Sequence, residues 1–324
     1  MQTQIGKDLA KAKDYLLAGE IVAIPTETVY GLAANALDPT AVIKIFETKN
    51  RPSFNPLIIH VADWEMVPAY VNYIPLKATI LAAKFAPGPI TFLLNKKDLI
   101  PDVVTAGSEK VAIRIPDHPL TQALLRSIEF PLAAPSANPF GYISPTTAMH
   151  VFENLSGKIP YILDGGAAEV GIESTIIGFD ENERVILYRS GGVPAEAIEE
   201  LLQEKLVTQK QSLNNFPSIP GQQKSHYAPH TQLHVGDINQ LINDWQGKNI
   251  AIISYAYSYE NVPLQNQFLL SPTKDLSEAA KNLFAALRAI DNLGADVILA
   301  EVFPEEGIGR AINDRLKRAG AENK

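Results

Sequence analysis

Apolar runs and helical patterns follow one another along most of the chain. Runs of consecutive apolar residues predict buried strands, and apolar residues three or four apart predict helices with one buried face. Strands are expected at residues 21–24, 57–61, 90–94, 111–115, 132–134, 161–163, 175–179 and 185–188. Helices are expected at residues 7–18, 75–85, 118–128, 145–154 and 194–204, and from Asp38 onward. Because several strands are consecutive, the pattern predicts an α/β fold with a mixed sheet.

The spacing also predicts which side chains of the helices face the core. Residues three or four positions apart lie on the same side of a helix. The expected core positions are Leu9, Leu16 and Leu17 in the first helix, Val42, Ile43 and Phe46 in the second, and Leu76, Ile80, Leu81 and Phe85 in the third.

A change of composition after about residue 204 indicates a second domain. Residues 208–232 are rich in Gln, Ser, Asn and Pro and predict a linker. So long a loop is uncommon inside a compact domain and is either disordered or functional. A smaller α/β domain is predicted beyond it, with strands at residues 250–254 and 297–303 and helices at residues 276–293 and 309–319. The predicted parts are a domain at residues 1–205, a linker at 206–232 and a domain at 233–324.

Composition and charge narrow the function. The 324 residues include no cysteine, which excludes disulfides, zinc–thiolate sites and thiol nucleophiles. A net charge of -8 argues against a protein that coats nucleic acid by neutralising phosphates. The first 20 residues have no apolar core like that of a signal peptide, and no stretch approaches the roughly 18 apolar residues of a membrane span. We therefore expect a cytoplasmic protein.

Two polar segments lie beside the first predicted strands. PTETVYG, residues 25–31, follows the first of these strands, and the basic pair Lys49 and Arg51 precedes the second. Loops at the edge of a rigid sheet commonly carry binding groups. Thr and Tyr also favour strands, so Thr26 and Tyr30 have a structural alternative.

Four cationic side chains are candidates for binding phosphate, namely Lys49, Arg51, Arg114 and Arg189. Neither GxxxxGK[ST] nor GxGxxG occurs, so a nucleotide would have to be held by scattered cationic and hydroxyl side chains. Each of the four cations lies close to a turn former or a strand end. Fixed positive groups would stabilise the charge of a transferring phosphoryl group, whereas the structural alternative is a surface ion pair.

Arg114 lies on a predicted strand that has one apolar face. Alternation places Ala112 and Arg114 on one face of the strand, opposite Val111, Ile113 and Ile115. An arginine in this position either points into a cleft or forms a buried structural ion pair.

Several sequence blocks together carry a resemblance to a known family. The chain contains PTETVYGLAANA, KNRP and NPLIIHV, followed by PGPITFLL, VAIRIPDHP, APSAN and GIESTII. In these blocks it closely resembles the YrdC-like domain of threonylcarbamoyl-adenylate synthases. The two-domain layout and the late block GIGRAINDRLKRAG resemble the long form of that family. The resemblance implies a YrdC-like twisted mixed sheet with flanking helices, and a smaller C-terminal Rossmann-like α/β domain.

The resemblance also implies binding roles for residues of this sequence. The residues that would bind L-threonine are Thr26, Ile58, His60, Arg114, Ala134 and Ser174. The residues that would bind ATP are Lys49, Arg51, Ser53, Lys110, Ser136, Asn138, Ser144 and Arg189, together with His226 or Tyr227 from the linker. Lys49, Arg51 and Arg114 would act electrostatically, and no covalent nucleophile is expected.

Some of these residues also have simpler interpretations. APSAN could form an ordinary turn, Ser144 could cap the next helix, and His60 could be a core histidine. Three histidines from His226 onward are spaced four apart, as metal ligands on a helix would be. Pro229 lies between them and breaks such a helix, which disfavours a metal site.

The implied activity is that of a nucleotidyltransferase, an L-threonylcarbamoyladenylate synthase. It would make threonylcarbamoyl-AMP and pyrophosphate from L-threonine, bicarbonate or carbon dioxide, and ATP, for the threonylcarbamoyladenosine modification of tRNA. The linker is expected to act as a lid. Mg²⁺ is expected to accompany ATP, held by phosphate and water because the sequence shows no carboxylate cage.

The expected partners follow from the same resemblance. Proteins that transfer the threonylcarbamoyl group to tRNA would receive the product, and no stable binding to nucleic acid or membrane is expected. Two alternatives are an RNA-binding module and a paralogue that transfers carbamoyl groups to other acceptors. The net charge argues against the first. The threonine-side residues Thr26, Arg114 and Ser174 argue against the second.

Overall fold

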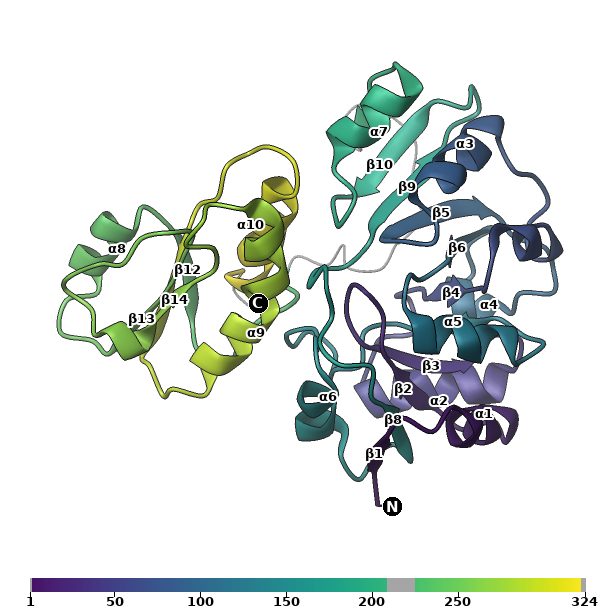
Figure 1. The fold of residues 1–324 in the computed structure, drawn as a ribbon, viewed down its shortest axis with the longest axis horizontal. Helices are drawn as coiled ribbons and strands as arrows, with labels where there is room; N and C mark the ends of the chain where they lie inside the picture. Colours follow the sequence, from purple (N-terminus) through teal and green to yellow (C-terminus); the bar gives the residue numbers. More distant parts are fainter. Residues whose placement is uncertain (1, 209–224, 322–324) are drawn as a thin grey trace. The chain divides into compact units, whose positions relative to one another are not determined.

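A computed structural model describes residues 2–208 and 225–321 of the chain, which form two compact units (Figure 1). The described residues of the first unit are 2–140, 145–169 and 173–208, and those of the second are 141–144, 170–172 and 225–321. Residues 209–224 of the predicted linker lie outside the described residues. The predicted domain boundaries therefore stay a prediction. None of the described helices is both long and apolar enough to cross a membrane.

The first unit is organised around one large mixed sheet. Within residues 2–208, eleven strands pair in the order β1-β8-β2-β3-β7-β4-β6-β5-β9-β10-β11. The strands are β1 Gln4–Gly6, β2 Val22–Ile24, β3 Gly31–Asn35, β4 Ile58–His60, β5 Ile90–Asn95, β6 Lys110–Arg114, β7 Leu132–Ala133, β8 Tyr161–Leu163, β9 Thr175–Phe179, β10 Val185–Arg189 and β11 Val207–Thr208. Strands β4 and β6 are parallel, whereas β5 and β6 are antiparallel. The predicted mixed sheet is confirmed.

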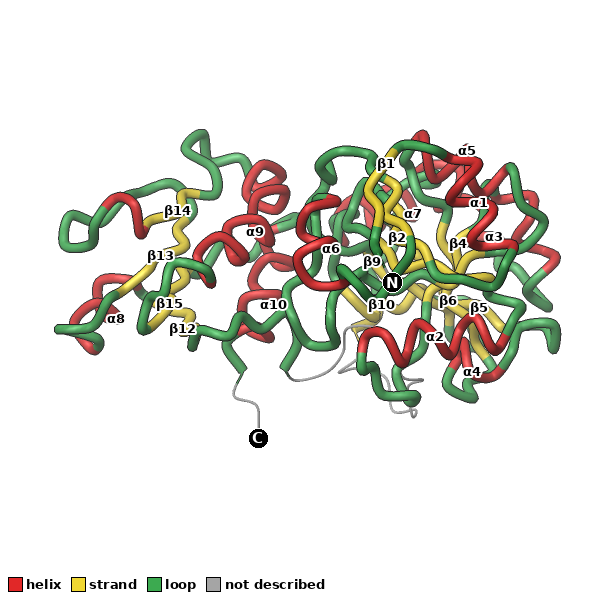
Figure 2. Tube along the Cα trace, turned by 90° about the horizontal axis from the view of Figure 1, so that it is seen from below, coloured by secondary structure: helices red, strands yellow, loops and turns green. Residues whose placement is uncertain are grey.

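Helices pack on both faces of this sheet, and Figure 2 shows its strands in yellow between helices in red. The helices are α1 Leu9–Leu17, α2 Pro39–Lys49, α3 Leu76–Phe85, α4 Asp102–Thr105, α5 Pro119–Arg126, α6 Ala148–Leu155 and α7 Ala195–Leu202, with the 3-10 helix η1 Trp64–Ala69. Side chains of α2, α3, α4, α6 and α7 join the larger core cluster on one face. Side chains of α1 and α5 join the cluster on part of the other face.

The remainder of that second face, over β4, β5, β6, β9 and β10, is packed differently. Its buried cluster consists of strand residues alone, namely Ile58, Leu93, Ala112, Ile176, Ile186 and Tyr188. These residues make an apolar floor in the middle of the sheet. The residues that the resemblance implies for L-threonine binding include Ile58 of this floor and Arg114, which shares the face of Ala112.

Local signals explain where the first helices start and stop. The Asp38 side chain accepts the backbone N–H of Thr40, and Pro39 occupies the first turn, where its missing N–H costs nothing. Asn50 ends α2 in the left-handed conformation at φ 51°. The basic pair therefore lies at a helix end, with Lys49 as the last helical residue.

Four of the predicted core positions on the helices are wrong, and strand β3 was missed. Leu17, Ile43, Leu76 and Ile80 are exposed rather than buried. In α3 the buried positions are Ala78, Leu81 and Ala82, so only Leu81 of the four predicted core positions is fully buried and two alanines complete the packed face. Strand β3 was not predicted, because GLAAN lacks the β-branched and aromatic residues that indicate strands.

The second unit contains a smaller parallel sheet, which confirms the predicted Rossmann-like α/β domain. Within residues 225–321, four strands pair in the order β12-β15-β13-β14. The strands are β12 Leu233–Gly236, β13 Ile250–Ser254, β14 Gln267–Leu269 and β15 Val297–Glu301, and the helices are α8 Ile238–Asp244, α9 Leu276–Asp291 and α10 Gly309–Ala319, with the 3-10 helix η3 Leu264–Asn266. All three strand pairs are parallel.

Candidate active site

Three central strands, β4, β5 and β6, bring separate parts of the sequence to one face of the large sheet. His60 is opposite Arg114 in the β4–β6 pair, and Arg114 is opposite Thr91 in the β5–β6 pair. Ala112 belongs to the apolar floor, whereas Val111, Ile113 and Ile115 join the core on the opposite face. The predicted alternation along β6 is therefore confirmed, and Arg114 shares the face of Ala112.

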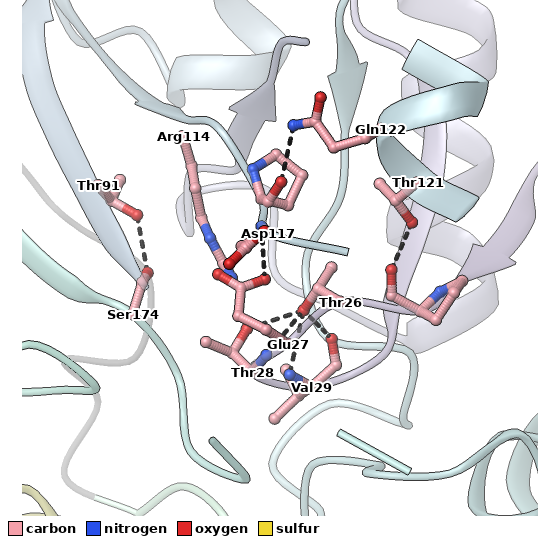
Figure 3. A network of polar contacts seen from close by, with 12 residues as sticks. Thr26, Glu27, Thr28, Val29, Thr91, Arg114, Asp117, Thr121, Gln122 and Ser174 are labelled. Carbon is pink, nitrogen blue, oxygen red and sulfur yellow. Dashed lines mark hydrogen bonds and ion pairs between the residues drawn. The ribbon is translucent and has the colours of Figure 1, made fainter. Parts of the chain in front are cut away.

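Arg114 forms a buried ion pair with a residue that the sequence analysis did not assign to the site. Its Nη2 lies 2.6 Å from Oε1 of Glu27, and the two side chains are only 5% and 6% exposed. The other carboxylate oxygen of Glu27 accepts the backbone N–H of Asp117 at 3.0 Å. Figure 3 shows the Arg114 and Glu27 side chains pointing toward one another.

The donors of Arg114 are not all used. A guanidinium carries five N–H groups. Among the described residues, Nε and Nη2 of Arg114 have no hydrogen-bond partner, although Nη2 lies within ion-pair distance of Glu27, and Nδ1 of the neighbouring His60 has none either. Buried polar groups are normally paired. This part of the face can therefore accept a ligand that brings hydrogen-bond acceptors to Arg114.

His60 is held as a neutral ring. Burial, together with the positive charge of Arg114, lowers its pKa to about 3, although the backbone at Leu132 and Ile58 opposes the shift. At neutral pH the imidazole therefore adds hydrogen-bonding capacity to the site without adding charge.

Thr26 shapes the turn that carries Glu27. Its hydroxyl donates to the carbonyl of Val29 at 2.6 Å and accepts the backbone N–H groups of Thr28 and Val29 at 3.2 Å each. Residues 25–30 lie in no strand, so strand propensity does not explain this threonine. Its predicted contact with substrate stays a prediction, and the structure gives it a role in fixing the Glu27 loop.

Ser174 is likewise tied into a small network beside Arg114. Its hydroxyl lies 2.7 Å from that of Thr91 and accepts Nη2 of Arg189 at 3.1 Å. Arg189 also donates Nε to the Ser174 carbonyl at 3.1 Å. Arg189, at the end of its strand, therefore lies beside Ser174. Figure 3 shows Ser174 together with Thr91 and Arg114.

The APSAN segment is hydrogen-bonded to the end of helix α2, to strand β4 and to Gly31 at the start of β3. Lys49 donates its ammonium N–H groups to the carbonyl of Ser136 at 2.6 Å and to that of Asn138. Ala134 donates its backbone N–H to Ile58 at 3.0 Å, and Ser136 bridges to Gly31. Burial and the nearby charge of Arg51 lower the pKa of Lys49. APSAN is therefore more than an ordinary turn, because a buried cation fixes its backbone.

Arg51 braces the loop that follows α2. Its Nε donates to the Asn55 carbonyl at 3.0 Å, and Nη2 donates to the Asn55 side chain and the Pro56 carbonyl, both at 2.7 Å. Ser53 is exposed at the tip of this loop. Lys49 and Arg51 were predicted as electrostatic groups. The structure adds that both hold backbone carbonyls and so determine the shape of the loops.

Lys110 does not lie near Arg114 and the other predicted site residues on this face of the sheet. It lies at the opposite end of β6 from Arg114 and is paired with Asn95. Its ammonium donates to the Phe179 carbonyl at 3.3 Å and lines a hollow with Tyr73. Burial lowers its pKa. The structure therefore separates Lys110 from Arg114.

Three predicted nucleotide ligands belong to the second unit. Tyr227 is buried, with its ring centroid 5.3 Å from that of Phe284, and the guanidinium of Arg315 lies 5.6 Å from the Tyr227 ring. His226 donates its backbone N–H to the Arg318 carbonyl at 3.3 Å. The third, Ser144, is fully buried. Their predicted contacts with a nucleotide stay predictions.

The capping role of Ser144 is wrong. Helix α6 begins at Ala148, and the side chain of Thr147 accepts the backbone N–H of His150 at its start. Ser144 lies three residues too early, and its carbonyl accepts Nε of Arg288 at 3.4 Å. Within the described ranges, no three His, Asp or Glu side chains group as a metal site.

Each part of the chain matches a known family model. Residues 14–191 match the family model of Sua5, YciO and YrdC proteins, described as "Telomere recombination". Residues 193–321 match the model described as "Threonylcarbamoyl-AMP synthase, C-terminal domain". The threonylcarbamoyl-AMP synthase of Pyrococcus abyssi is 42% identical over 95% of this chain and 92% of its own length. That of Bacillus subtilis is 41% identical over 96% of this chain and 92% of its own.

Solved structures agree with these relatives. The crystal structure of P. abyssi Sua5 complexed with L-threonine matches with a TM-score of 0.88 at 38% identity, covering 98% of this chain and 97% of that chain. Full-length HypF in its phosphate- and nucleotide-bound form matches with a TM-score of 0.51 at 23% identity, covering 58% of this chain and 29% of that chain. The second likeness shows the fold alone.

Proposed function

The chain belongs to the threonylcarbamoyl-AMP synthase family in its long two-domain form, and on that basis we propose that it makes threonylcarbamoyl-AMP. The substrates are L-threonine, carbon dioxide or bicarbonate, and ATP, and the second product is pyrophosphate. The proposal is supported by full-length similarity to named synthases, one of which has a structure with L-threonine bound. It is also supported by Arg114, a buried cation whose Nε and Nη2 have no hydrogen-bond partner among the described residues.

The chemistry requires positioning more than a reactive side chain. The neutral threonine amine first adds to carbon dioxide and, with loss of a proton, gives a carbamate. A carbamate oxygen then attacks the α-phosphorus of ATP, and pyrophosphate leaves. Arg114 holds the threonine carboxylate, for which a planar guanidinium is well suited. Holding both reactants in one shielded site supplies much of the rate.

The nucleotide would be bound by loops that internal cations have already shaped. Lys49 fixes the backbone of APSAN, so the hydroxyl of Ser136 is presented from a rigid segment. Arg51 does the same for the loop that carries Ser53. Their positive charges also favour the phosphates from within these loops. Arg189 contributes beside Ser174.

Magnesium is expected with the nucleotide rather than in a cage of protein ligands. The described residues include no group of carboxylates suited to holding it. Mg²⁺ commonly keeps several waters and binds substrate phosphates. Magnesium would therefore enter the site as part of the Mg²⁺–ATP substrate. The lid role of the linker, the contact from His226 or Tyr227, and transfer of the product to tRNA by other proteins belong to the same proposal.

The test is release of pyrophosphate from ATP by the full chain. We expect release to require both L-threonine and bicarbonate, and Arg114→Ala to abolish it. Arg114→Lys keeps a positive charge beside Glu27 but loses the two-pronged geometry, so its activity loss cannot be ascribed to misfolding alone. Arg184→Ala is the matched control, because Arg184 pairs with Asp180 on the surface.

Two outcomes would contradict the proposal. Unchanged turnover in the Arg114 variants would remove the role assigned to that residue. Salt-dependent RNA binding without threonine-dependent pyrophosphate release would favour the RNA-binding alternative.

A further inference from the structure

Glu27 is held in place by three features of the site. The hydroxyl of Thr26 fixes the turn on which it lies. One of its carboxylate oxygens accepts the N–H of Asp117 at 3.0 Å, and the other lies 2.6 Å from Nη2 of Arg114. With a side chain only 6% exposed, the carboxylate has little freedom to move.

The ion pair of Arg114 and Glu27 keeps hydrogen-bond donors and acceptors that a ligand could use. An ionised carboxylate offers about four lone-pair positions, and a guanidinium offers five N–H groups. Oε2 of Glu27 accepts one N–H. Oε1 of Glu27 and both Nε and Nη2 of Arg114 form no hydrogen bond with the described residues, although Oε1 and Nη2 face each other as an ion pair. Nδ1 of His60, in register with Arg114, also has no hydrogen-bond partner among them. Unpaired buried groups on a cation and a neutral ring, beside an anion, indicate a polar ligand that carries both charges.

An α-amino acid has this distribution of charge. Its carboxylate and its ammonium are attached to one carbon, so a receptor needs a cation and an anion side by side. Arg114 supplies the cation and Glu27 the anion, at 2.6 Å from each other. The neutral His60 adds no competing charge.

We propose that Glu27 binds the α-ammonium group of the threonine whose carboxylate is bound by Arg114. Glu27 is then a substrate-specificity residue that selects amino acids over hydroxy acids. This inference rests on the proposed function, because it takes threonine as the occupant of the site. Glu27 acts in binding, before the amine becomes a nucleophile.

The test compares three ligands by calorimetry on the full chain. L-Threonine carries both charged groups, 3-hydroxybutyrate lacks the ammonium, and L-threoninol lacks the carboxylate. Wild-type protein is expected to bind L-threonine about 10- to 100-fold more tightly than 3-hydroxybutyrate, the typical effect of one hydrogen bond to a charged group. Equal affinities for these two ligands would overturn the inference without any variant being made.

Glu27→Gln then assigns the effect to one side chain. It keeps the size of the side chain and one oxygen acceptor but removes the charge. We expect L-threonine to bind about 10- to 100-fold more weakly, while 3-hydroxybutyrate changes by less than about threefold. In turnover assays, the KM for threonine should rise more than kcat falls. Glu20→Gln, which alters the partly exposed ion pair with Lys44, is the matched control and should change neither.

The outcomes separate this inference from the proposed function. If wild-type protein binds threonine and releases pyrophosphate, but Glu27→Gln binds threonine equally well, the role of Glu27 is overturned and the function stands. If both ligands weaken equally in Glu27→Gln, Glu27 is only structural and the inference is again overturned. If wild-type protein neither binds threonine nor turns over with it, both proposals fail.

Discussion

Arg114 in the first unit and Arg288 in the second are both buried arginines, but their guanidinium groups have different partners. Arg288 donates Nη2 to the Ile143 carbonyl at 2.5 Å and Nε to the Ser144 carbonyl at 3.4 Å. It also lies 5.0 Å from the ring of Tyr142. Arg114 instead forms an ion pair with Glu27, and its Nε and Nη2 have no hydrogen-bond partner among the described residues.

These two patterns of partners separate a structural arginine, which braces a loop, from one that is available to a ligand. A buried cation surrounded by carbonyl oxygens fixes the course of a loop, as Arg288 does for residues 143–144. Lys49 and Arg51 belong to the same class. A buried cation that keeps an unpaired donor is arranged for something other than the protein itself. Charge and burial alone would not have separated the two classes.

The largest effect on stability is expected from Arg114→Met. This change leaves the Glu27 carboxylate buried without its cation, and removing one partner of a buried pair typically costs about 3–5 kcal/mol. Urea unfolding should show this loss, and the double variant Glu27→Gln/Arg114→Met should recover much of it. Equal losses in the single and double variants would mean that the two side chains are not coupled.

Arg288→Met should destabilise the protein less. It leaves the carbonyl groups of Ile143 and Ser144 without this donor, and the expected cost is about 1–3 kcal/mol. The same urea experiment measures it, with Arg184→Met as the exposed control that should cost less than about 1 kcal/mol. A loss at Arg288 as large as that at Arg114 would contradict the distinction between brace and binding group.

Lowering the pH should reduce the free energy of unfolding of the first unit, because His60 is neutral in the folded protein. The folded protein keeps this ring neutral down to about pH 3, whereas the unfolded chain protonates it near the ordinary value of 6.5. Between these values the unfolded chain binds the extra proton, so the free energy of unfolding falls as pH falls, by up to about 1.4 kcal/mol per pH unit. Above pH 6.5 this contribution is constant.

The pH effect can be isolated with His60→Asn. Measured between pH 6.5 and 5, where exposed carboxylates stay largely ionised, the slope should be smaller in this variant than in the wild-type protein. Identical slopes would show that His60 does not gain its proton only on unfolding.

The smallest effect is expected from Thr91→Val, which keeps the shape of the side chain. It removes the hydroxyl that lies 2.7 Å from Ser174, whereas Arg189 still donates to Ser174. We expect a loss of about 1 kcal/mol in thermal unfolding. A loss above about 3 kcal/mol would mean that the Thr91–Ser174 contact organises the site far more than its neighbours do.

The sequence predicted many elements well because its signals there are local. Apolar runs located β8 and β9, and the amphipathic pattern of residues 309–319 located α10. Hydrophobic patterning failed to predict the elements in which small side chains are buried. GLAAN forms the buried strand β3 without any strand former, and α3 packs through Ala78 and Ala82 while Leu76 is exposed.

By itself, the sequence determined which chemical groups are available and which face of a strand each one takes, because alternation along a backbone is a local property. It placed Arg114 on the face of Ala112. The partners depend on the packing of the chain: Arg114 pairs with Glu27, and Lys49 donates to backbone carbonyls. The same packing leaves Lys110 at the far end of β6 from Arg114. Those partners come from segments that are distant along the chain, and only the packing of the strands brings them within hydrogen-bonding distance.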